Sequence, residues 1–141
     1  SAAQLISKGK IIGWYQGRSE AGARALGNRS IIAAASDKHM REKVNARIKY
    51  REEFRPFAPS VLFEDSEEYF TTNGRDLPFM SFTAKCALNK RKKIHSVVHV
   101  DGTSRVQTVR SSDNEMYYDL IKKYKNINID GFFAARLTRN D

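Results

Sequence analysis

The chain has 141 residues and a hydrophobic fraction of 40%, which is enough for one domain with a core of its own. No apolar run approaches the roughly 20 residues of a membrane-spanning helix, and the lone Cys86 excludes an internal disulfide. The first residues lack the apolar run of a secretory signal, so none is expected. We therefore expect a cytoplasmic protein without a membrane partner. The net charge of +9 predicts an anionic partner, either nucleic acid, a nucleotide or a phosphorylated metabolite.

The positive charge is concentrated in the first part of the sequence. Residues 1–60 hold twelve Lys or Arg against five Asp or Glu, and seven of the twelve are arginines set among Gly, Pro and aromatic residues. Residues 61–84 hold one Arg against five acids. A second basic block, "KRKK" at 90–93, is typical of lysines that are simply solvated. The first block therefore carries the stronger indication of an anion site.

Taken in chain order, the sequence predicts alternating helices and strands. A short helix ends at Gly9, and the main strands are expected in one twisted sheet, at 11–15, 30–34, 79–85 and 98–109. Helices are expected at 37–49, where apolar residues recur every fourth position, and at 113–124. Ser112 and Glu115 have the spacing of a capping box for the second of these helices. The fold class is α/β or α+β, with a mixed sheet and flanking helices.

The first candidate site is the segment "GRSEAGARALGNRSI", residues 17–31. Its glycines could bring backbone N–H groups close to a phosphate, and arginines such as Arg24 could bind the phosphate oxygens with a planar fork. It matches neither a Walker motif nor a dinucleotide fingerprint. The equally plausible alternative is a surface loop whose arginines pair with Glu20.

The second candidate site is "NARIKYREEFRPFAPS". Lys49, Arg51 and Arg55 follow the predicted helix, and two prolines stiffen the backbone after them. Cations on a stiff, anchored segment are preorganised for binding. The alternative is that Lys49 and Arg51 only complement the helix C-terminus.

The third candidate site is "HVDGTSRVQTV". Polar residues alternate along this predicted hairpin, which places them on one face, namely His99, Asp101, Thr103, Arg105 and Gln107. Such a face normally contacts water, and the alternative is that it lines a cleft with Arg105 directed at a ligand. No second histidine has metal-ligand spacing, so no metal site is expected within the chain.

Together, "GWYQGRSEAGARALGNRSI", "NARIKYREEFRPFAPSVL", "PFMSF" and "HVDGTSRVQTV" resemble the C-terminal, YrdC-like domain of nodulation and antibiotic-tailoring O-carbamoyltransferases. The resemblance covers about residues 5 to 125, so 1–125 is expected to be this domain and 126–141 a divergent or truncated tail. It implies a domain that combines ATP, with Mg²⁺, and carbamoyl phosphate into carbamoyl adenylate. A separate N-terminal domain would then transfer the carbamoyl group to an acceptor hydroxyl.

The resemblance also implies roles for individual residues. Lys49, Arg55 and Arg105 would be catalytic, and the substrate-binding set would be Arg24, Lys49, Arg51, Arg55, His99, Asp101, Thr103 and Arg105. The physical reason is that two anionic substrates repel, so joining them needs a cationic site. The chain alone is expected to be weakly active or inactive. The alternative function is a basic nucleic-acid-binding domain without catalysis.

Overall fold

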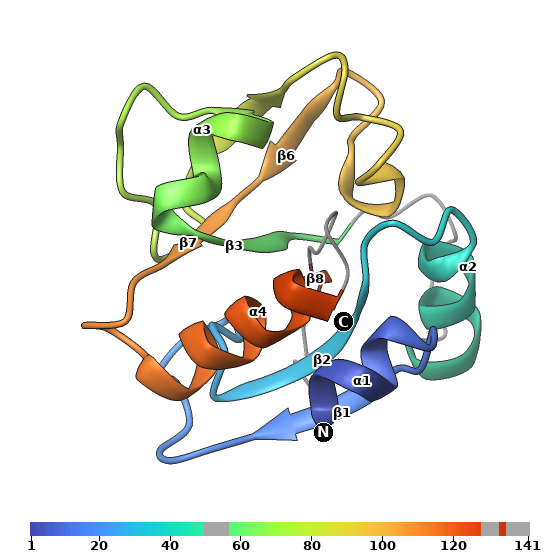
Figure 1. Ribbon diagram of the computed structural model, residues 1–141, viewed down its shortest axis with the longest axis vertical. Helices are drawn as coiled ribbons and strands as arrows, with labels where there is room; N and C mark the ends of the chain where they lie inside the picture. Colours follow the sequence, from blue (N-terminus) through green and yellow to red (C-terminus); the bar gives the residue numbers. More distant parts are fainter. Residues whose placement is uncertain (50–56, 128–132, 135–141) are drawn as a thin grey trace.

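A computed structural model describes residues 1–49, 57–127 and 133–134 (Figure 1). The helices are α1 (Ala2–Ser7), α2 (Met40–Val44), α3 (Ser66–Tyr69) and α4 (Glu115–Ile127). The strands are β1 (Ile12–Tyr15), β2 (Arg29–Ala34), β3 (Pro59–Leu62), β4 (Phe70–Thr71), β5 (Thr83–Cys86), β6 (Thr103–Arg105), β7 (Gln107–Val109) and β8 (Phe133–Ala134). A π-helical turn, Asn45–Lys49, extends α2, and short 3₁₀ turns occupy Phe63–Asp65 and His95–Val97.

The strands form two sheets rather than the single sheet that the sequence predicted. The larger sheet has the order β1-β2-β8-β3-β7 and is mixed, because β3 and β7 are parallel while its other pairs are antiparallel. The smaller sheet, β4-β5-β6, is antiparallel. The predicted class, a mixed α/β fold with flanking helices, is confirmed.

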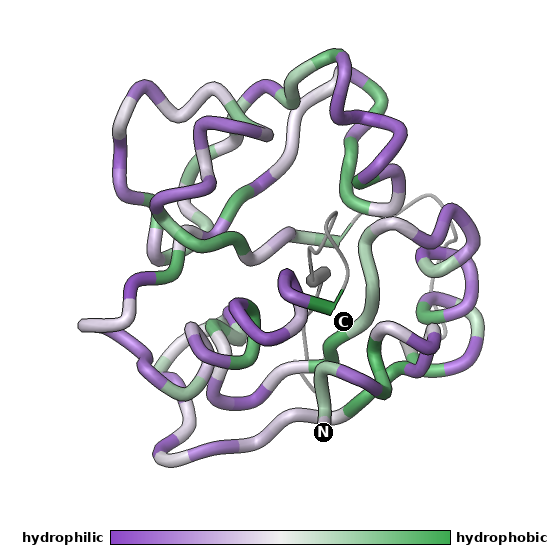
Figure 2. Tube along the Cα trace, viewed as in Figure 1, coloured by the Kyte–Doolittle hydropathy of each residue, from purple (hydrophilic) through white to green (hydrophobic). Residues whose placement is uncertain are grey.

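The larger sheet separates two hydrophobic clusters, and the alternation of side chains along β2 shows how. Ile32 and Ala34 point into a cluster formed with α1 and α4, whereas Ala33 belongs to a second cluster with α2 and the smaller sheet. Both faces of the sheet are therefore covered, and hydrophobic residues follow the central strands (Figure 2). Cys86 lies buried in the second cluster, as expected for a core residue, and burial raises the pKa of its thiol.

The two predicted helices differ in how well the sequence placed them. The helix predicted at 113–124 is α4, which buries Tyr117, Leu120, Ile121 and Tyr124. The predicted capping box is wrong, because Asn114 Oδ1, not Ser112, accepts the Tyr117 N–H at 3.1 Å. The helix predicted at 37–49 is shorter, since regular α-helix covers only α2 and the following turn is π-helical.

The segment 98–109 is not one hairpin, which corrects the third predicted site. Residues 99–102 form a turn, β6 pairs with β5 in the smaller sheet, and β7 pairs with β3 in the larger one. Gln107 consequently leaves the polar face and is buried, where its amide donates to Leu26 O and accepts from Ser60 Oγ. Residues 79–82, predicted as the start of a strand, precede β5 and form no strand.

Within the described ranges, no helix is long and apolar enough to cross a membrane.

Candidate functional site

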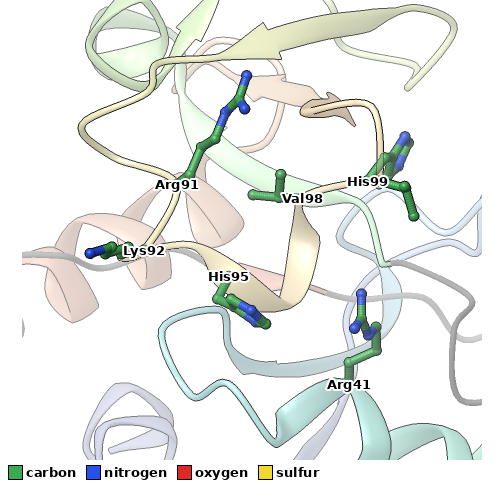
Figure 3. Close-up of a pocket in the computed structure, with 7 residues that line it drawn as sticks. Arg41, Arg91, Lys92, His95, Val98 and His99 are labelled. Atoms are coloured by element: carbon green, nitrogen blue, oxygen red, sulfur yellow. The ribbon is translucent and has the colours of Figure 1, made fainter.

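A basic cavity of about 310 Å³ lies between α2 and the segment that leads into β6 (Figure 3). Arg41 extends from α2 toward the segment that carries Val98 and His99. The described residues that line it are Arg41, Arg91, Lys92, His95, Val98, His99 and Val100. No carboxylate occurs among these residues, and none of the described acids forms an ion pair with Arg41, Arg91 or Lys92. Among the described residues, the three cations of this cavity therefore have no ion-pair partner.

Arg41 is held at the cavity by the helix that carries it. Its neighbour Met40 and, one turn on, Val44 are buried in the core, which fixes the orientation of α2. The Arg41 Nε atom is buried and has no hydrogen-bond acceptor within the described structure. A buried N–H without an acceptor is costly, so an oxygen of a bound anion would satisfy it.

Arg91 is seated against the turn that follows His99. Its Nε donates to the Cys86 carbonyl at 3.3 Å. Its guanidinium lies so close to Gly102 that a Cβ at that position would be 2.3 Å from a guanidinium nitrogen. The absence of a side chain in "HVDGT" at this position makes room for the arginine.

The turn itself is closed by its own polar groups. His99 N donates to Thr103 O at 2.8 Å, and Gly102 N donates to His99 O at 2.9 Å. Asp101 Oδ1 accepts from both the Thr103 hydroxyl, at 2.7 Å, and the Thr103 N–H, at 3.0 Å. These bonds lower the pKa of Asp101. Asp101 and Thr103, predicted to bind substrate, thus contact each other and hold the turn.

His99 is the predicted site residue that lines the cavity. Its Nδ1 lies 3.2 Å from Thr103 Oγ1. Burial lowers the pKa of His99, Asp101 opposes this effect and Arg105 adds to it. The imidazole is therefore neutral at pH 7, in a cavity whose other polar groups are mostly cationic.

The sequence profile of the family described as Carbamoyltransferase C-terminus matches residues 3–131. The chain belongs to this family. The family resemblance inferred from the motifs is thereby confirmed.

Relatives of this carbamoyltransferase C-terminal domain are much longer proteins. The chain is 46% identical to Nodulation protein NolO of Bradyrhizobium diazoefficiens over 89% of the chain and 23% of the relative. It is also 46% identical to Nodulation protein NolNO of Sinorhizobium fredii, over 88% of the chain and 18% of the relative. An uncharacterized protein of Methanocaldococcus jannaschii is 44% identical over 89% of the chain and 20% of its own length. The chain thus spans about a fifth of these relatives.

The structure brings together part of the predicted site of this domain. Arg105 ends β6, opposite Thr83, and is close enough to His99 to act on its pKa, but it does not line the cavity. Arg24 is half-buried in the connection between β1 and β2 and is also not among the lining residues. Lys49 ends the π-helical turn; its side chain, together with Arg51 and Arg55, lies outside the described residues.

The glycine-rich connection of the carbamoyltransferase C-terminal domain uses its backbone donors internally. The Leu26 and Asn28 N–H groups donate to Glu20 Oε1 at 2.6 and 2.8 Å. Arg29 pairs with the other Glu20 oxygen at 3.5 Å and donates to the Gly22 carbonyl. These two N–H groups therefore bind a carboxylate of the chain itself, and the alternative of pairing with Glu20 is correct for Arg29.

Four polar residues of the cavity were not among the predicted site residues, namely Arg41, Arg91, Lys92 and His95. The "KRKK" block was interpreted as solvated, whereas Arg91 is half-buried against the turn. Arg41 adjoins Met40 on the predicted apolar stripe of its helix, a position from which a side chain borders the buried face. This position beside the apolar stripe was the feature of the sequence that could have indicated Arg41 as a site residue. It does not indicate which other residues Arg41 faces.

Proposed function

We propose that this domain binds carbamoyl phosphate and ATP and forms carbamoyl adenylate, which another part of a longer carbamoyltransferase uses to modify a hydroxyl group. The observation that carries the proposal is the basic cavity, in a chain that belongs to a carbamoyltransferase family. The length of the relatives supports a further domain as the partner. Formation of the adenylate would consume one water and release phosphate and pyrophosphate.

The chemistry of the cavity supports a small anion as its ligand. Arginine presents a planar fork of N–H donors to phosphate oxygens, and lysine adds a compact charge. In a recess lined by one sign of charge, the potential attracts an anion and repels a cation. Carbamoyl phosphate offers three phosphate oxygens to Arg41, Arg91 and Lys92, and the Arg41 Nε–H would gain an acceptor.

The residues inferred from the family resemblance complete the proposed site. Arg105, beside His99, would stabilise charge that develops on the transferring oxygens, together with Lys49 and Arg55. Arg24 and Arg51 would bind the second polyanion, ATP. Mg²⁺ would bind to the ATP phosphates, and no cluster of three His, Cys, Asp or Glu side chains suited to a metal occurs in the described parts of the chain.

The test compares two single charge removals from neighbouring positions. Arg41→Gln removes the arginine from the cavity wall, whereas Lys38→Gln removes an exposed charge three residues away that does not line it. Binding of inorganic phosphate, carbamoyl phosphate and ATP is measured by calorimetry, with circular dichroism to verify folding. We expect Arg41→Gln to weaken phosphate binding about tenfold or more, because hydrogen bonds to charged groups are the strong ones, and Lys38→Gln to change it less than about twofold.

Two outcomes would contradict the proposal. Equal effects of the two substitutions would show that the cavity is not the binding site. Binding of single-stranded polynucleotide that falls steeply with salt, without measurable binding of phosphate or carbamoyl phosphate, would favour the nucleic-acid alternative.

A further inference from the structure

The hydroxyl of Thr103 determines which nitrogen of His99 carries a proton. Thr103 Oγ1 lies 2.7 Å from Asp101 Oδ1 and 3.2 Å from His99 Nδ1. An ionised carboxylate only accepts hydrogen bonds, and a hydroxyl has one proton to donate. The Thr103 proton therefore points to Asp101, and the contact with His99 requires that Nδ1–H donates to Oγ1.

This arrangement leaves the other nitrogen, Nε2, with a free lone pair. A neutral imidazole carries one proton, and here that proton is on Nδ1. Burial lowers the pKa of His99 and so favours the neutral ring, while Asp101 opposes this effect and Arg105 supports it. Within the described structure no donor is bonded to Nε2, and His99 is one of the residues that line the basic cavity.

The cavity thus combines two kinds of polar group. Arg41, Arg91 and Lys92 can only donate hydrogen bonds. His95 is exposed and has no hydrogen bond in the described structure that fixes its tautomer. Among the side chains of the described lining residues, Nε2 of His99 is therefore the acceptor whose protonation the fold specifies, in a wall otherwise suited to an anion. A complementary ligand carries anionic oxygens at one end and an N–H donor at the other.

We propose that His99 is a specificity-determining residue, whose Nε2 accepts a hydrogen bond from the carbamoyl amide and so selects carbamoyl phosphate over acyl phosphates. Acetyl phosphate has a methyl group where carbamoyl phosphate has NH₂, and it would leave Nε2 without a donor. Thr103 and Asp101 are positioning residues, because their hydrogen bonds determine which nitrogen of His99 is protonated. The inference rests on the proposed function, because it assumes that phosphate binds in the same cavity.

The ligand experiment uses two stable analogues that differ only at the recognised group. Phosphonoacetamide ends in an amide, and acetonylphosphonate has a methyl ketone in the same place. We expect the unmodified chain to bind the amide about three- to tenfold more tightly. His99→Phe should reduce this ratio to about one, because phenylalanine retains a ring but has no acceptor. His39→Phe, at an exposed histidine outside the cavity, should leave the ratio unchanged.

A spectroscopic measurement tests the tautomer without any ligand. In ¹⁵N-labelled protein, the two ring nitrogens of His99 should show the shifts of a protonated Nδ1 and an unprotonated Nε2 at pH 7. Thr103→Val removes the hydroxyl and should shift the signals toward the mixed tautomers of a free imidazole, with a partial loss of discrimination between the analogues. A protonated Nε2 in the unmodified chain would overturn the inference.

The outcomes separate the two proposals. If inorganic phosphate binds and the two analogues bind equally, the role of His99 is wrong and the proposed function stands. If inorganic phosphate does not bind to the folded chain, the proposed function is wrong, and the ligand assigned to His99 is wrong with it.

Discussion

Gly27 lies against the ring of Tyr117, which belongs to the cluster formed with α1 and α4, and a single methyl group there should be strongly destabilising. Gly27 has a φ of +106°, and a Cβ at this position would be 2.4 Å from Cδ1 and 2.6 Å from Cγ of Tyr117. The ring of Tyr117 is 1% exposed, and its hydroxyl donates to Ser60 Oγ at 2.9 Å. The ring therefore cannot move aside without breaking that bond and disturbing the packing of α4.

The expected magnitude of Gly27→Ala has two parts. A residue with a Cβ in this region of φ costs about 1–3 kcal/mol of backbone strain. Overpacking against a fixed ring costs about 1–3 kcal/mol more. The sum of about 2–6 kcal/mol is a large share of the roughly 5–15 kcal/mol by which domains of this kind are stable. Gly22→Ala provides the matched control, because Gly22 has a φ of +126° but nothing within 4 Å of its Cβ position.

Urea unfolding of the two variants measures the difference directly. We expect Gly27→Ala to lose about 1–3 kcal/mol more than Gly22→Ala, which is the overpacking part alone. Adding Tyr117→Ala should remove most of this excess, since the clashing ring is then absent, although the variant loses the tyrosine's own packing. Equal losses from the two glycine substitutions would refute the argument that the ring is fixed.

Three further predictions concern charged and titrating groups. Glu20→Gln should lower the free energy of unfolding by about 1–3 kcal/mol, because two backbone N–H groups lose a charged acceptor; an unchanged urea midpoint would contradict this. Burial raises the pKa of Tyr117 to about 12, so stability should fall as pH rises from about 10 through 12, and an absorbance titration should find this phenol ionising above the ordinary tyrosine pKa of about 10. Burial tends to raise the pKa of Asp76, but hydrogen bonds from Thr108 and Arg110 outweigh burial and hold this pKa below its usual value. The stability that the ionised Asp76 contributes is therefore present above about pH 4 and lost on acidification. Asp76→Asn should therefore make acid unfolding, followed by circular dichroism, less steep.

The sequence predicted those elements whose residues reveal their own environment. The apolar spacing of Tyr117, Leu120 and Ile121 identified α4, and the β-branched run through Ile32 identified β2. α4 buries one regular stripe of side chains, and β2 is buried on both faces. In each case the pattern of apolar residues along the sequence is sufficient to identify the element.

Pairing partners could not be predicted in the same way. Period two placed Arg105 and Gln107 on one face, but it contains no information about which strand each segment joins. The same limit applies to the site. Arg41 and His99 are far apart in the sequence, and only the packing of α2 beside the segment before β6 brings them to one cavity. Glu20, interpreted as a possible partner for arginines, satisfies backbone N–H groups, a role that depends on the path of the loop.

The change of sheet between β6 and β7 has a mechanical consequence. A single residue, Val106, separates the two strands, and its side chain is fully buried. A hinge needs residues that can change their backbone angles without moving apolar surface into water. Rotation at this joint would extract Val106 from the core, so the turn that carries His99 keeps a fixed distance and orientation relative to the larger sheet. On the opposite wall, the buried side chains of Met40 and Val44 hold α2 in the same way, so these two walls of the cavity keep their places when a ligand binds.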